Sequence, residues 1–131
     1  MGLSDLPSRK SKRFVSQKAF EENLERQLAL TPQTIRQLRT CNVMPEKRRK
    51  LEFFFFTNTV EKAAALAAEL MNKNYEVEHR PSASDARIQI ITGWTTEVTM
   101  SDDTLLEWTR EMCTLGFTHD CDFDGWGTNA E

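Results

Sequence analysis

The most distinctive chemical spacing in the sequence lies near its C-terminal end, from Asp120 to Glu131. This stretch matches the EF-hand calcium-loop pattern, with carboxylates at loop positions 1, 3 and 5, glycine at position 6 and glutamate at position 12. The three carboxylates and the glycine are Asp120, Asp122, Asp124 and Gly125. Loop position 8 is Gly127 instead of the usual hydrophobic residue, and Gly116 is expected to end the preceding helix too early. We keep calcium binding as a minor alternative and predict an acidic turn after a strand, with Trp126 packed on the core.

Other groups that could perform catalysis are few. His79 and His119 are the two histidines, and neither has a serine or cysteine partner at a recognised spacing. The sequence has no P-loop, no dinucleotide-binding glycine pattern and no metalloprotease helix. Its three cysteines include no Cys-x-x-Cys pair, which favours reduced thiols in the cytoplasm. We therefore expect a protein that is not an enzyme and that uses no cofactor and no metal.

Charge is distributed unevenly along the 131 residues. Residues 1–50 carry 12 Lys and Arg against 5 Asp and Glu, whereas residues 51–131 carry 5 against 15. A basic arm is suited to nucleic acid, an acidic body is suited to a basic partner, and the two halves are equally suited to each other. The length predicts one domain, and the absence of a long apolar run or a signal peptide predicts a cytoplasmic protein without a membrane span.

The elements that position these residues centre on an aromatic run, Leu51–Thr57, which reads Leu-Glu-Phe-Phe-Phe-Phe-Thr. Such a short aromatic run predicts a strand in the middle of a sheet, with phenylalanines on both faces. Before it, the spacing predicts an amphipathic helix over 16–28 and a second short helix that begins at Thr31-Pro32. A loop through Asn42 and Pro45 leads from this second helix to the strand.

After the aromatic strand, the pattern predicts a helix over 59–74 that is capped by Asn58 and Glu61. Strands are expected over 75–79 and 87–91, the second extending through Met100, and the last helix begins at Ser101 and ends at Gly116. A fourth strand is expected over 118–123. The resulting order, βαββαβ, predicts an α+β fold, a ferredoxin-like two-layer α/β sandwich with an N-terminal helical extension.

Such a sheet has one face without helices, and that face would carry two phenylalanines of the aromatic strand. We predict that the N-terminal helices cover at least part of it, within the same chain or by exchange with a second copy. Their apolar residues at helical spacing are Phe20, Leu24, Leu28, Ile35 and Leu38. A second copy of the chain, giving a homodimer, or a different protein are the alternatives.

The tail sequence Asp124-Gly-Trp-Gly-Thr128 resembles the Asp-Gly-Trp signature of the family of the regulator of RNase E activity B (RraB). The resemblance continues through Leu30–Leu38, the aromatic strand and Thr59–Leu70, so it spans about Leu30 to Thr128. It divides the chain into a basic N-terminal arm with an amphipathic helix, residues 1–30, and an RraB-like α/β sandwich domain, residues 31–131. The family's split βαβ fold agrees with the element order predicted above.

The resemblance implies a non-enzymatic, cytoplasmic, bacterial ribonuclease inhibitor that binds ribonuclease E, or a related ribonuclease, and modulates RNA decay. We expect the partner-binding residues to be Asp120, Asp122, Asp124, Gly125, Trp126, Gly127 and Thr128. The alternative is an RNA-contacting accessory protein that uses the basic clusters Arg9–Arg13 and Lys47–Lys50. Because Phe14 is the sole aromatic residue beside those clusters, a base-stacking platform is missing, and we expect no direct nucleic-acid binding.

Overall fold

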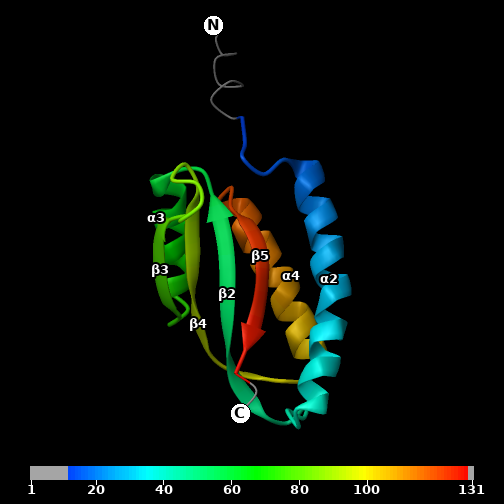
Figure 1. Cartoon of the computed structure of the whole chain (residues 1–131). Coiled ribbons are helices and arrows are strands. Elements are labelled where there is room, and N and C mark those ends of the chain that lie inside the picture. Colours follow the sequence, from blue (N-terminus) through cyan, green and yellow to red (C-terminus); the bar gives the residue numbers. More distant parts are fainter. Residues whose placement is uncertain (1–11, 130–131) are drawn as a thin grey trace, which may run out of the picture.

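The computed structural model describes residues 12–129 as three helices and a four-stranded sheet (Figure 1). In chain order, with the labels of Figure 1, the elements are α2 (Gln17–Thr40), β2 (Arg48–Thr57), α3 (Val60–Met71), β3 (Glu76–Pro81), β4 (Gln89–Thr99), α4 (Asp102–Thr118) and β5 (Asp122–Thr128). The expected calcium-loop residue Glu131 and the basic residues Arg9 and Lys10 lie outside the described residues.

The strands form one antiparallel sheet in the order β3-β4-β2-β5, with the aromatic strand β2 in the interior. Figure 1 shows α3 and α4 behind the strands, so that the face toward the reader carries no helix. This arrangement confirms the predicted two-layer sandwich of βαββαβ order.

The N-terminal region forms a single helix, α2, instead of the two helices predicted. Ser16 caps it as expected, but the helix continues through Pro32 although proline cannot donate the backbone hydrogen bond of a helix interior. Thr31, predicted to be an N-cap, is buried, and its hydroxyl lies 3.1 Å from that of Thr109 on α4. Packing against α4 therefore holds the helix together across the proline. The boundary predicted between residues 30 and 31 falls inside α2, and that division stays a prediction.

The core lies between the sheet and the helices. Phe53 and Phe55 of β2 are 0% exposed and face this layer, whereas Phe54 on the opposite face is 36% exposed. Ile35 and Leu38 of α2 join the same core cluster as Phe53 and Phe55.

The prediction that the N-terminal helices cover the open face of the sheet within the same chain is therefore wrong. Helix α2 packs mainly against α4 and lies beside the edge strand β5 (Figure 1). Phe20 stacks on the Phe117 ring of α4, with 4.5 Å between the ring centroids. One residue that precedes the helix does reach the open side: Phe14 lies edge-on to Phe56 with a centroid distance of 6.0 Å.

Several predicted boundaries shift by a few residues. Thr59, not Asn58, caps α3 by accepting the backbone N–H of Lys62 at 3.1 Å. Helix α4 continues past Gly116 to Thr118. Gly116 therefore lies inside the helix, at a point where Phe55 and the Cys121 carbonyl leave no room for a side chain. The last strand is Asp122–Thr128, so that the Asp-Gly-Trp segment is extended instead of forming a turn. The predicted extension of the third strand is confirmed by β4.

Candidate functional site

Asp120, the first of the predicted partner-binding residues, is an internal anchor instead of a surface residue. It is 8% exposed and adopts a left-handed φ of 60° between α4 and β5. Its carboxylate accepts the backbone N–H groups of Phe14 and Val15 at 2.9 and 2.8 Å. Lys62 Nζ lies 2.6 Å from the same carboxylate and Arg13 Nε lies 3.5 Å away. Asp120 thus ties the N-terminal segment to the end of α4.

These contacts also set the ionisation of Asp120. Burial by itself would raise the pKa, but the hydrogen bonds from Lys62, Phe14 and Val15 outweigh burial and lower the pKa below its ordinary value.

The calcium-loop alternative does not fit this geometry, because 122–128 is an extended strand and the Asp120 oxygens are held by amides and cations. Within residues 12–129, no group of three or more acidic, histidine or cysteine side chains is placed to hold a metal ion.

The side chains of α2 cover part of the outer edge of β5. Asn23 Nδ2 donates to the Phe123 carbonyl at 2.8 Å and to the Asp122 carboxylate at 3.1 Å, and Gln27 Nε2 lies 3.4 Å from the same carbonyl. Burial raises the pKa of Asp122. Because Phe123 O is already occupied, an incoming strand cannot pair with this part of the edge.

Trp126 is half-buried between two helices. Its indole Nε1 donates to Thr31 Oγ1 of α2 at 3.2 Å, and its ring lies edge-on to Trp108 of α4 with 6.0 Å between centroids. Together with Asp124 and Gly125, Trp126 lines a hollow of about 210 Å³ between β5 and α2. Leu30, which is 43% exposed, lines the α2 side of this hollow. The remaining predicted residue, Thr128, donates its hydroxyl to the Lys50 carbonyl at 2.5 Å.

The open face of the sheet is arranged in cross-strand rows, which the antiparallel register fixes. One row is Arg80, Ile90, Phe56 and Asp122; the next is Glu78, Thr92, Phe54 and Gly125; the third is Glu76, Trp94, Glu52 and Gly127. Phe54 is exposed, and Phe56, Ile90 and Trp94 are half-buried. Sequence analysis did not single out Ile90 and Trp94, although their spacing of an even number of residues along β4 was the available signal.

A hollow of about 250 Å³ opens between β3 and β4 on this face. The side chains at its rim include Glu76, Glu78, Thr92 and Trp94, so two carboxylates stand beside an indole ring. Glu78 pairs with Arg80 at 3.1 Å, and both side chains are largely exposed. The Thr92 hydroxyl donates to the Phe53 carbonyl and is therefore occupied internally.

With this geometry established, comparison with known proteins identifies the family. Residues 29–128 match the family model described as RraB, regulator of ribonuclease activity B. The chain belongs to the RraB family. The match ends at the last residue of β5 and includes the whole sheet, so both the open face and the β5 edge lie within it. No curated protein matches the chain at a significant level.

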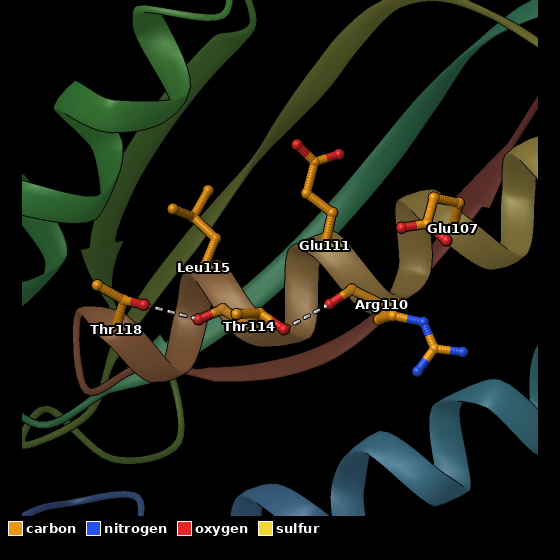
Figure 2. A pocket seen from close by; sticks show the side chains of 6 residues that line it. All are labelled: Glu107, Arg110, Glu111, Thr114, Leu115 and Thr118. Atoms are coloured by element: carbon orange, nitrogen blue, oxygen red, sulfur yellow. Dashed lines mark hydrogen bonds between the residues drawn. The ribbon is translucent and has the colours of Figure 1, made fainter.

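Another hollow of this RraB-family chain, larger than the two described above, lies along the outer face of α4. Figure 2 shows its six lining residues, Glu107, Arg110, Glu111, Thr114, Leu115 and Thr118, which enclose about 580 Å³. The hydroxyls of Thr114 and Thr118 donate to carbonyls of the same helix at 3.0 Å, and Glu111 pairs with Lys73 at 3.0 Å. Because these polar groups are used locally and do not converge, size alone does not make this groove the functional site.

Arg13 of the first basic cluster and Arg48 of the second lie at opposite ends of β2 in this RraB-family chain. Arg13 at one end places its guanidinium 4.2 Å from the centre of the Phe117 ring and donates to the Phe117 carbonyl. At the other end, Arg48 is 3.7 Å from Glu97 across the β2–β4 pair.

Between residues 12 and 129, no helix combines the length and the apolar composition needed to cross a bilayer.

Proposed function

We propose that this RraB-family member is a non-enzymatic regulator that binds ribonuclease E in the cytoplasm and thereby slows RNA decay. The observation that carries the proposal is the family match, which extends over the complete βαββαβ unit. The burial of two of the three cysteines agrees with it. Burial raises the pKa of Cys113 to about 12 and that of Cys121 to about 11, so both thiols are poor nucleophiles at neutral pH.

We propose that the partner contacts the segment from Asp124 to Thr128, because Asp120 is buried and bonded within the fold. Asp124 is exposed, and a side chain built at Gly125 or Gly127 would meet no atom within 4 Å. Leu30 stands across the adjacent hollow with 43% of its surface exposed. An acidic group, an apolar side chain and two glycines that leave room for a partner together suit a protein contact.

Binding of the purified chain to purified ribonuclease E, measured by isothermal titration calorimetry, tests the proposal. We expect saturable binding with a Kd at or below about 10 µM, which corresponds to roughly 7 kcal/mol. An unrelated single-strand-specific ribonuclease serves as the control and should give no heat of binding. Absence of binding to ribonuclease E at concentrations well above this Kd would contradict the proposed function.

One observation favours the second candidate, an RNA-contacting accessory protein. Sequence analysis predicted no base-stacking platform, but Phe14 of the basic segment lies against Phe56, and Phe54 stands exposed beside it. Aromatic rings therefore do lie between Arg13 and Arg48, on the sheet face that RNA-binding sheets use to stack bases. A salt titration of RNA binding decides between the candidates, because phosphate contacts make affinity fall steeply with salt.

A further inference from the structure

We propose that the open face of the sheet docks a basic protein segment and seats one of its arginine side chains in the hollow between β3 and β4. The identity of the partner as a ribonuclease rests on the proposed function. The chemistry of the docking segment rests on the residues of this face alone.

The hollow has the two features that a guanidinium requires. Glu76 and Glu78 supply carboxylates at its rim, and Trp94 supplies an aromatic face beside them. A cation gains from both, because carboxylates accept its N–H groups and the indole ring attracts its charge. Within the described part of the chain Glu76 has no basic partner, and the pair of Glu78 with Arg80 is exposed at 70% and 59% of the two side chains. Such an exposed pair contributes little, so an incoming arginine can replace it.

An apolar shelf adjoins the hollow. Phe54 lies next to Thr92 in the same row, and on its other side stands Gly125, which projects no side chain. The next row ends in Gly127, where an added side chain would likewise meet nothing within 4 Å. An aliphatic or aromatic side chain of the partner can therefore lie on Phe54 over the two glycines, one strand away from the seated arginine.

Charge selects a protein segment over the other occupants of such a face. The row of Phe54 and the two rows beside it carry more acidic than basic residues. The acidic residues are Glu52, Glu76, Glu78 and Asp122, and the basic residue is Arg80. The acidic residues repel RNA phosphates, although the rings alone would suit bases. A symmetric dimer would place the same acidic patch of a second copy against this one, which is also repulsive.

Three indole signals allow the test to be read from one NMR spectrum of the ¹⁵N-labelled chain. Trp94 stands at the hollow, whereas the Trp108 and Trp126 indoles donate to Tyr75 Oη and Thr31 Oγ1 inside the fold, both at 3.2 Å. The probes are a 15-residue peptide of alternating arginine and leucine, the same peptide with glutamate in place of every arginine, poly(U) RNA, and ribonuclease E. We expect the arginine peptide to shift the Trp94 indole and to leave the other two in place. Ribonuclease E, which would also contact the segment 124–128 under the proposed function, should shift the Trp94 and Trp126 indoles and leave that of Trp108 in place.

The matched variants are Glu76→Gln/Glu78→Gln on the open face and Glu107→Gln/Glu111→Gln on the opposite, helical face, since each removes two negative charges from exposed positions. The first should weaken binding of the arginine peptide about tenfold or more, and the second should change it less than about twofold. If both variants weakened binding of the arginine peptide equally, the net charge of the chain alone would explain the binding, and the proposal would be overturned. A Trp94 shift caused by poly(U) and not by the arginine peptide would overturn it in favour of RNA.

The results also separate this inference from the proposed function. If ribonuclease E binds with the Trp94 indole unmoved and with equal affinity for the Glu76→Gln/Glu78→Gln variant, the proposed function stands and this docking face is wrong. If the arginine peptide shifts Trp94 as described but ribonuclease E does not bind, the docking chemistry stands and the proposed partner is wrong.

Discussion

Replacement of Asp120 by asparagine should release the N-terminal segment from the end of α4. Asparagine has the same size but offers one acceptor oxygen, whereas the carboxylate accepts the amides of Phe14 and Val15 at 2.9 and 2.8 Å. One of the two amides would then face an NH₂ group, and the contact with Lys62 at 2.6 Å would lose its charge. Hydrogen bonds to charged groups contribute about 1.5–3 kcal/mol each. Lys62 and Arg13 can turn to water, so we expect a total loss of about 2–3 kcal/mol.

The pH dependence follows from the direction of the pKa shift. Because the pKa of Asp120 is lower in the folded chain than its ordinary value of 3.8, its contribution to stability is complete above about pH 4. It is lost as the pH falls through the folded-state pKa, where the carboxylate becomes protonated. The unfolding free energies of the wild type and of Asp120→Asn should therefore differ at pH 7 and converge in acid.

Urea unfolding and hydrogen exchange measure both aspects. At pH 7 the variant should lose about 2–3 kcal/mol, equivalent to a Tm lower by roughly 10 °C for a domain of this size. If the segment detaches locally, the Phe14 and Val15 amides should exchange about 30- to 150-fold faster. Asp124→Asn, an exposed control, should cost less than about 0.5 kcal/mol. Unchanged stability together with unchanged exchange of these two amides in Asp120→Asn would refute the anchoring role.

Three further measurements check other contacts. Trp126→Phe keeps an aromatic ring but removes the donor to Thr31, and should cost about 1 kcal/mol in urea unfolding; a cost near zero would show that this bond contributes nothing. Gly116→Ala should lower the free energy of unfolding by about 1–2 kcal/mol, although alanine has the better helix propensity. The new methyl group would lie 2.9 Å from both a carbonyl oxygen and a phenylalanine ring. Gly127→Ala, with open space around it, is the control and should leave the free energy of unfolding nearly unchanged. Ellman's reagent at pH 8 should label one thiol quickly, that of the exposed Cys41, and the two buried thiols after unfolding; rapid labelling of all three would contradict the burial that raises their pKa.

The sheet could be predicted from the sequence because local pattern and tertiary environment agree there. The phenylalanine run indicates β2 and the alternation of residues indicates β4. The Ser101 cap indicates the start of α4, the helix that follows β4. The tail could not be predicted in the same way. Its aspartates satisfy a calcium-loop pattern, but pairing of residues 122–128 with β2 leaves that segment extended, and pairing partners are not visible in local sequence.

The helix α2 shows why the candidate site was only partly predictable. Its most apolar stripe, through Phe20, Leu24 and Leu28, is not its most buried one. The buried face begins with Asn23, Gln27 and Thr31, which are buried because their side chains form hydrogen bonds. Asn23 and Gln27 bond the Phe123 carbonyl, and Thr31 bonds Thr109 and Trp126. Hydrophobic periodicity cannot reveal a face that is buried through hydrogen bonds, and the expected cover for Phe54 was therefore assigned to a helix that lies elsewhere.

The central claim, that this RraB-family chain regulates a ribonuclease by binding it, is tested most directly by an RNA cleavage assay. Purified ribonuclease E at fixed concentration would cleave a labelled single-stranded RNA while the concentration of the chain is increased. The account predicts that the cleavage rate falls along the same concentration curve as binding, that excess RNA does not displace the chain, and that the chain alone cleaves nothing. An unchanged cleavage rate at concentrations that saturate the ribonuclease with the chain would contradict it.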